Sequence, residues 1–172
     1  PAGTVTPFAT GFGSLAGVAQ SPVTGRIVVG DSSSGGPEAL FLLEDLNDDG
    51  DALDPGENIP HPTQPPVLSN GAAPLPFDIL FVPGTDTFFM SGSTPFGVEP
   101  PLGVVTLTDG GSVGVYADGL GFPGALLLDG DTLLCADVDS TTFTGSVATL
   151  RDLDDNGDAL GVDENVDFAT GF

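Results

Sequence analysis

Two acidic segments of this chain have the residue types and spacing of a calcium-binding loop. The first, DLNDDGDALDPGE, runs from Asp45 to Glu57, and the second, DLDDNGDALGVDE, runs from Asp152 to Glu164. Both place Asp or Asn at positions 1, 3 and 5 and Gly at position 6. Calcium prefers six to eight hard oxygens in a flexible geometry, with a glycine at the sharp turn. Each segment therefore predicts one structural calcium site.

The residue that closes each site is predicted from the register that the two segments share. An EF-hand has a bidentate acid at position 12, where these segments have Gly56 and Asp163, but position 13 is Glu57 in one and Glu164 in the other. We therefore expect these glutamates to close loops that are one residue longer, with position 7 coordinating through its backbone carbonyl. The predicted metal ligands are Asp45, Asn47, Asp49, Asp51, Glu57, Asp152, Asp154, Asn156, Asp158 and Glu164.

Neighbouring acids in these segments have other expected roles. Asp48 and Asp155, at position 4, are predicted to face solvent, and ligation by Asp54 or Asp163 is left open. The alternative interpretation is a pair of solvated acidic turns, in which Asp and Asn only supply turn conformations. Six matched positions favour metal, and calcium is preferred to magnesium, which tends to keep its water ligands.

The charge of the chain excludes some partners. The formal net charge is −23, with 25 acids, two arginines (Arg26 and Arg151) and no lysine. A direct nucleic-acid partner is excluded because no basic patch can form, and an anionic membrane surface is disfavoured for the same reason. Twelve of the acids lie in the two acidic segments, which again indicates bound cations.

The single cysteine and the calcium prediction bear on location. Cys135 lies in the apolar run TLLCADV and is predicted to be a buried, unreactive thiol, and no internal disulfide is available. Weak calcium sites belong to extracellular modules, so we expect an extracellular or cell-surface protein. The sequence has no signal peptide and no membrane-spanning run, so membrane insertion is not expected. It begins with Pro1, which suggests a processed product or an excerpt of a longer chain.

Short apolar runs bounded by Gly, Pro, Asp or Ser recur throughout the chain and predict an all-β fold. Three segments share one order, namely strand, polar turn, strand, small-residue linker and hairpin, with a length of roughly 50 residues. The expected organisation is an N-terminal strand segment (1–14), a first unit with a calcium loop (15–60), a Pro-rich connector (61–74), a second unit without a loop (75–119), a third unit with a loop (120–167) and the start of another repeat (168–172). FATGF occurs at residues 8–12 and again at 168–172.

These motifs resemble those of the NHL/YVTN-type β-propeller proteins secreted by bacteria. The resemblance lies in LEDLNDDGDALDPGE, LRDLDDNGDALGVDE and the strand–turn–strand units, and it covers roughly residues 8 to 168. It implies a β-propeller-like array of about three four-stranded antiparallel blades. Propellers close with four to eight blades, so the array would be incomplete as a single ring.

Enzymatic activity is not expected, and no catalytic residues are predicted. The only histidine, His61, lies between two prolines and is predicted to be a solvent-exposed linker residue. Asp31, Asp78 and Asp137, near strand ends, could imitate the metal-binding acids of lactonase-type propellers. Metal-dependent lactone hydrolysis is therefore kept as the least favoured alternative.

The leading prediction is a non-enzymatic structural subunit stabilised by two calcium ions. An incomplete β array exposes strand edges that can pair with another chain. We therefore expect head-to-tail self-assembly into a fibre or surface array, in which TVTPFATGF of one copy follows ENVDFATGF of the previous copy. The alternative is an excerpt of a longer, closed β-propeller that serves as a binding module.

Overall fold

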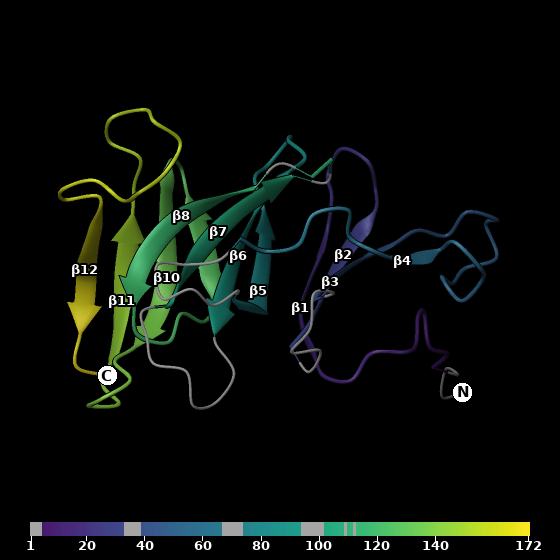
Figure 1. Ribbon diagram of the computed structural model, residues 1–172, viewed down its shortest axis with the longest axis horizontal. Helices are drawn as coiled ribbons and strands as arrows, with labels where there is room; N and C mark the ends of the chain where they lie inside the picture. The colour runs from purple at the N-terminus through teal and green to yellow at the C-terminus, as the bar shows by residue number, and fades with distance from the viewer. Residues whose placement is uncertain (1–4, 33–38, 67–73, 94–101, 109, 112) are drawn as a thin grey trace.

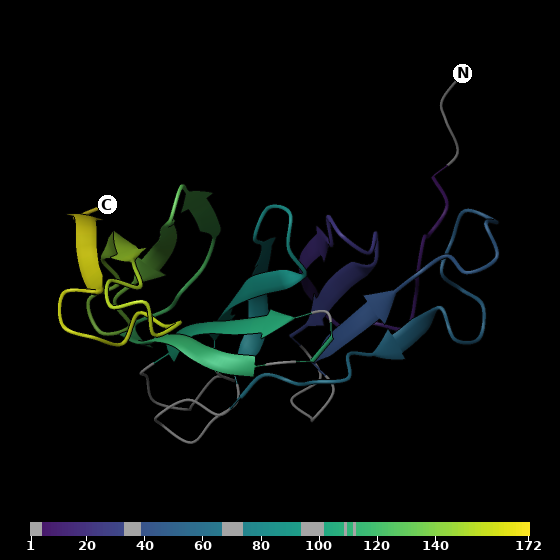
Figure 2. The same ribbon diagram turned by 90° about the horizontal axis from the view of Figure 1, so that it is seen from above.

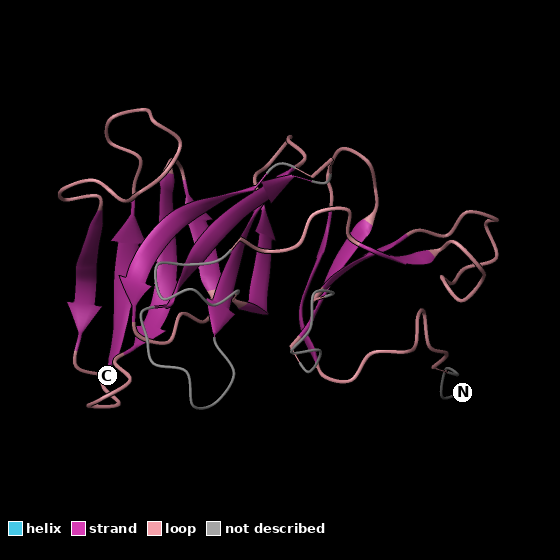
Figure 3. Ribbon diagram, in the orientation of Figure 1, coloured by secondary structure: helices cyan, strands magenta, loops and turns pink. Residues whose placement is uncertain are grey.

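The computed structural model describes residues 5–32, 39–66, 74–93, 102–108, 110–111 and 113–172 (Figure 1). In this part of the chain every regular element is a β-strand, and loops connect the strands (Figure 3). No helix capable of crossing a membrane occurs among these residues. The prediction of an all-β chain is confirmed.

The described strands form three four-stranded antiparallel sheets, each in chain order. The first contains β1 (Leu15–Gln20), β2 (Ile27–Asp31), β3 (Leu40–Leu43) and β4 (Asn58–Pro60). The second contains β5 (Leu75–Phe81), β6 (Thr87–Ser93), β7 (Leu102–Thr108) and β8 (Val113–Leu120). The third contains β9 (Leu126–Asp129), β10 (Thr132–Val138), β11 (Gly145–Leu150) and β12 (Asn165–Thr170). No sheet closes on itself, and three four-stranded antiparallel units are present, as predicted.

A glycine lies in the turn between the first two strands of each sheet. Gly25, Gly84 and Gly130 have φ values of 78°, 74° and 60°. A side chain with a Cβ atom is disfavoured at such positive φ, whereas glycine adopts it without steric cost. The segments SPVTGR, VPGTDT and LDGDT therefore reverse the chain at equivalent places in the three sheets.

Apolar side chains form one core between each pair of neighbouring sheets. Val28, Leu40, Phe88, Met90 and Leu107 lie in the core between the first and second sheets, and all are fully buried. The core between the second and third sheets includes Val104, Tyr116, Ala117 and Leu120 from one sheet and Leu133, Cys135, Ala148 and Leu150 from the other. Burial of each large apolar side chain contributes about 1.5–3 kcal/mol, so these cores hold the sheets together.

The sheets follow one another in an open arc (Figure 2). The first strand of the second sheet, β5, contacts β1 on one side and β9 on the other. The first and third sheets therefore lie at the two ends, with the second between them (Figures 1 and 2). This arrangement leaves one face of each end sheet without a neighbouring sheet.

The prediction of an exposed His61 is wrong. His61 follows β4 directly and is only 2% exposed. Its ring packs edge-on against Phe88 of the second sheet, with ring centroids 5.8 Å apart. Its Nδ1 atom lies 2.6 Å from the carbonyl oxygen of Thr63. The start of the predicted connector is thus part of the contact between two sheets, and residues 67–73 of that connector lie outside the described residues.

Candidate metal centres

Each acidic segment connects the last two strands of its sheet. The first acidic loop (residues 45–57) joins β3 to β4, and the second acidic loop (residues 152–164) joins β11 to β12 (Figure 1). The flanking elements are strands rather than the helices of an EF-hand. The loops therefore close equivalent hairpins in the first and third sheets.

The first position of each loop organises the backbone that follows it. Asp45 accepts the backbone N–H groups of Asp49 at 3.2 Å and Gly50 at 2.8 Å. In the second loop, Asp152 accepts those of Asn156 and Gly157 at 2.9 and 2.8 Å. One side chain thus folds the chain into a tight turn around its own carboxylate, and the turn is the same in both loops.

The turns also share their backbone conformations. Asp48 and Asp155 have φ values of 60° and 58°, and Gly50 and Gly157 have values of 96° and 95°. Aspartate is among the few residues other than glycine that tolerate this left-handed region. Both position-4 aspartates are exposed, as predicted. The matched register seen in the sequence therefore corresponds to one repeated loop conformation.

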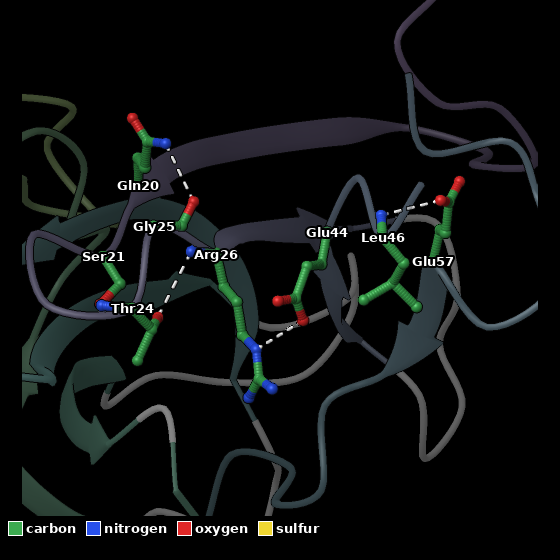
Figure 4. A network of polar contacts seen from close by, with 8 residues as sticks. All are labelled: Gln20, Ser21, Thr24, Gly25, Arg26, Glu44, Leu46 and Glu57. Atoms are coloured by element: carbon green, nitrogen blue, oxygen red, sulfur yellow. Dashed lines mark hydrogen bonds and ion pairs between the residues drawn. The ribbon is translucent and has the colours of Figure 1, made fainter. Parts of the chain in front are cut away.

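Glu57 and Glu164 join the two ends of their loops. Glu57 accepts the N–H groups of Leu46 at 2.8 Å and Asp54 at 3.1 Å, and the first of these bonds is drawn in Figure 4. Glu164 accepts those of Leu153 at 2.8 Å and Gly161 at 2.6 Å. The two glutamates are 1% and 2% exposed. A buried carboxylate needs such partners or a cation, because desolvation of its charge is costly.

The second acidic loop gathers carboxylates closely enough for one cation. Oxygen atoms of Asp152, Asp154 and Glu164 all lie within 4.8 Å of one another, the only such acidic group among the described residues. Calcium–oxygen distances are about 2.3–2.6 Å, so two oxygens on one ion lie up to about 5 Å apart. The donor set therefore fits a hard divalent cation.

The first acidic loop has the same backbone but a different third position. Asn47 replaces the carboxylate of Asp154, and its Nδ2 donates to Asp49 at 3.1 Å and to Asp54 at 2.7 Å. At position 5 the difference is reversed, because the first loop has Asp49 where the second has Asn156, so the two predicted ligand sets carry the same charge. Asp54, whose ligation was left open, lies beside a predicted ligand of the first loop.

Position 7 of each loop uses its side chain to stabilise the backbone. Asp51 accepts the N–H of Leu53, and Asp158 accepts the N–H of Leu160, each at 3.0 Å. These carboxylates are thus engaged within their own loops. Coordination through the position-7 carbonyl, as the sequence suggested, stays a prediction.

The residue before each loop is anchored to the neighbouring strand. Glu44 Oε2 accepts a hydrogen bond from Arg26 Nε at 2.9 Å (Figure 4). At the equivalent places in the third sheet, Arg151 Nε donates to Thr132 Oγ1 at 2.6 Å. Both arginines of the chain therefore fix the entrances of the acidic loops, through different partners.

The three aspartates considered for a lactonase-type centre bind backbone groups instead. Asp31 accepts the N–H groups of Gly13 and Ser14 at 2.9 and 3.0 Å. Asp137 accepts those of Gly121 and Phe122, and Asp78 accepts those of Ile79 and Leu126. The three residues come from β2, β10 and β5, in three different sheets. Each carboxylate fastens the segment that leads into the first strand of a sheet.

A polar groove of about 810 Å³ lies beside the third sheet and includes Asp137, Asp139 and Asp167 in its walls. Asp139 accepts hydrogen bonds from Thr141 Oγ1 and from the N–H groups of Thr141 and Thr142. These bonds, chiefly the one from the Thr141 hydroxyl, hold the pKa of Asp139 well below its usual range. Asp139 is therefore an anion that closes a surface turn.

Sequence reasoning missed a contact between each acidic loop and a segment that precedes its sheet. The N–H of Ala159 donates to the carbonyl of Tyr116 in β8 at 2.6 Å. The N–H of Ala52, at the same loop position, donates to the carbonyl of Phe8 at 2.7 Å. The repeated FATGF was the signal, because Phe8 begins its first copy. Each loop is thus packed against an apolar strand-like segment.

Comparison of the chain with family models, with curated proteins and with solved structures gave no match in any of the three cases.

Proposed function

We propose that the chain is an extracellular, calcium-stabilised, β-propeller-like repeat protein that assembles head to tail into a structural fibre or surface array and has no enzymatic activity. One observation carries this proposal. The third sheet has an exposed apolar face, and the equivalent face of the second sheet is buried against its neighbour.

The third sheet exposes apolar residues at positions that the second sheet uses for packing. We name this surface the donor face, and it comprises Leu127, Leu134, Val147, Phe168, Ala169 and Phe172. Their counterparts in the second sheet are Leu80, Phe89, Val104, Tyr116, Ala117 and Leu120, which pack on the third sheet. Leu127, Phe168 and Phe172 are 60%, 72% and 76% exposed. Exposed apolar surface of this kind marks an interaction site.

The first sheet contains the complementary surface, which we name the acceptor face and which comprises Val29, Leu43 and Ala52. These residues are only 3%, 4% and 1% exposed, because Ala9 and Phe12 of the N-terminal segment pack on them. Leu150 and Ala159 are the third-sheet counterparts of Leu43 and Ala52, and they receive the second sheet. Beside the acceptor face lies an apolar groove of about 490 Å³, which also includes Leu15 and Val18 in its walls. A donor face and an acceptor face on opposite ends favour a contact between copies of the chain.

Such a contact is head to tail, because the two faces differ. Heterologous contacts produce rings when the rotation closes and filaments when it does not. Propellers contain four to eight blades, so three blade-like sheets could be completed by those of further copies. The open arc of sheets supports this proposal.

Calcium accounts for assembly in spite of the charge. A chain with a formal net charge of −23 repels its copies, and bound cations reduce that repulsion. Ala52 of the first acidic loop belongs to the acceptor face, so metal binding would order a surface used for assembly. Weak calcium sites fill outside the cell, which supports an extracellular location.

A second candidate is a binding module within a longer, closed propeller. The repetition of residues 8–12 at 168–172 favours it equally, because another blade could follow residue 172 in the same chain. Both candidates cover the donor face, by a second copy in one case and by further sequence in the other. Hydrolysis of lactones has less support, since Asp31, Asp78 and Asp137 all bind backbone N–H groups.

Size measurement of the purified chain tests the proposed function. Light scattering after size exclusion should give a mass that increases with protein concentration in millimolar calcium and returns to one copy in excess chelator. Electron microscopy of the same samples should show rings or filaments only with calcium. A stable monomer at all concentrations in calcium would contradict self-assembly and favour the binding module.

A further inference from the structure

Residues 5–12 belong to no strand, yet they occupy the place beside the first sheet that β8 occupies beside the third. The carbonyl of Phe8 accepts the N–H of Ala52, as the carbonyl of Tyr116 accepts that of Ala159. The carbonyl of Thr10 also accepts Asn58 Nδ2 at 3.1 Å. In the same way, the carbonyl of Asp118 accepts Asn165 Nδ2 at 3.3 Å. The N-terminal segment therefore imitates the last strand of a preceding sheet.

The apolar contacts of residues 5–12 also correspond to those of β8. Ala9 and Phe12 pack against the acceptor face, and Phe12 also contacts Phe41 edge-on at 5.4 Å. Ala117 and Leu120 are their counterparts in β8 and belong to the core with Leu150 and Ala159. Residues 5–12 thus cover, within one chain, the surface that would receive another sheet.

Strand β12 is a third version of this element. In β8 the register shifts so that Val104 pairs with Ala117 and Val105 with Val115, which leaves Tyr116 as the extra residue. In β12, Val147 pairs with Ala169 and Ala148 with Asp167, so Phe168 is extra. Gly11, Gly119 and Gly171 follow with φ values of 101°, 84° and 90°. The same bulge and turn therefore prepare β12 to contact a following sheet.

Two identical segments, residues 8–12 and 168–172, would compete for one place when the donor face of one copy meets the acceptor face of another. Strand β12 is held by five registered pairs with β11. Within the part of the chain that the structure describes, residues 5–12 are held by two hydrogen bonds and by the packing of Ala9 and Phe12. Backbone ladders are lost cooperatively, whereas the N-terminal segment can leave alone. The N-terminal segment is therefore the one displaced.

We propose that residues 5–12 are a displaceable plug, and that residues 165–172 of a second copy replace them on the acceptor face during assembly. The Phe168 carbonyl then accepts the N–H of Ala52, and the Thr170 carbonyl accepts Asn58 Nδ2, both across the interface. The bonds from Gly13 and Ser14 to Asp31 stay intact, because they follow the plug. This inference rests on the proposed function and names its interface.

Two matched substitutions in the full-length chain test the exchange. Phe12→Ala weakens the plug, and Phe172→Ala makes the same chemical change in its competitor. The apparent dissociation constant is the intrinsic one divided by the fraction of chains whose acceptor face is uncovered. Weakening the plug raises that fraction and so lowers the apparent constant. Phe12→Ala should therefore lower the concentration at which copies assemble in calcium by about tenfold, and Phe172→Ala should raise it by about tenfold. A cooperative melting transition in each variant confirms that both are folded.

A labelled peptide of residues 165–172 gives a readout that does not require assembly. It should bind the Phe12→Ala chain about tenfold more tightly than the wild type. If the wild type stays monomeric but the peptide binds in this order, self-assembly fails and the exchange stands. If the wild type assembles while Phe12→Ala neither assembles nor binds peptide more readily, the exchange is overturned and self-assembly stands.

Discussion

The carboxylate of Glu164 accepts the backbone N–H of Leu153 at 2.8 Å. The last residue of this acidic loop is therefore hydrogen-bonded to the residue at its position 2. Glu57 and Leu46 are related in the same way in the first loop. A metal ion bound by these glutamates would add to a closure that the backbone already provides. We therefore expect metal binding to stabilise a β hairpin that is already closed by hydrogen bonds.

Removal of calcium should lower the melting temperature. A ligand at a hundredfold excess over its dissociation constant stabilises the folded state by about 2.7 kcal/mol. For a chain of this length that corresponds to a shift of about 5–10 °C for each occupied site. Differential scanning calorimetry with calcium and with excess chelator measures the shift. Coincident melting curves under the two conditions would refute the calcium sites.

Asp152 and Asp155 provide a matched pair for testing the site in the second acidic loop. Asp152 belongs to the carboxylate group of the second loop, whereas Asp155 is exposed at position 4. Asp152→Asn should remove at least half of the calcium-dependent melting shift, because it deletes a charged ligand. Asp155→Asn removes the same charge and should leave the shift unchanged. Isothermal titration with calcium checks both variants, and equal losses would assign the effect to net charge.

Substitution of Asp31 by asparagine should lower the stability of the folded chain. Asp31 is 5% exposed and accepts two backbone N–H groups, but asparagine has a single acceptor oxygen. Asp31→Asn leaves one N–H without its acceptor and should lower the free energy of unfolding by about 1–3 kcal/mol. Urea titration measures this loss, with exposed Asp86→Asn as the control. Unchanged stability would remove the structural role assigned to Asp31.

The buried thiol makes stability depend on alkaline pH. Burial, with a smaller contribution from Asp137, raises the pKa of Cys135 from 9.0 to about 12. The unfolded thiol ionises near pH 9 and the folded one does not, so the associated stability is present below pH 9 and is lost as the pH rises toward 12. Between pH 8.5 and 10.5 the free energy of unfolding should fall by about 2 kcal/mol more in the wild type than in Cys135→Ala. Urea titration at both pH values measures this difference.

A thiol reagent tests the same burial independently. Cys135 has no exposed surface, so it should react only after urea unfolds the chain. Fast labelling of the native protein at neutral pH would contradict both the burial and the raised pKa.

The strands and loops could be predicted because contiguous residues encode them. Short apolar runs between turn residues identified the three sheets. The register of the acidic segments singled out Glu57 and Glu164, which hydrogen-bond across their loops, while their role as metal ligands stays a prediction. The burial of Cys135 also followed from its apolar neighbours and is confirmed.

Contacts between sheets could not be predicted in the same way. His61 is buried because it packs against Phe88, which belongs to another sheet. The residues next to His61 in the sequence do not indicate that contact. The gathering of three carboxylates in the second loop alone depends on Asp154 replacing Asn47, a difference that the shared register concealed. The contact of Phe8 with Ala52 likewise depends on how the N-terminal segment folds back.

The identity of residues 8–12 and 168–172 has a consequence for the concentration at which copies would assemble. Both segments offer the same side chains and carbonyls to the acceptor face, so most of their local contact energy cancels in an exchange. The tethered copy competes at an effective concentration that is about millimolar for a short flexible connection. The incoming copy must overcome that advantage with contacts from Leu127, Leu134 and Val147, which the plug lacks. Dilute chains would therefore remain monomeric. Assembly would begin only where the local concentration of the chain is high, for example at a surface.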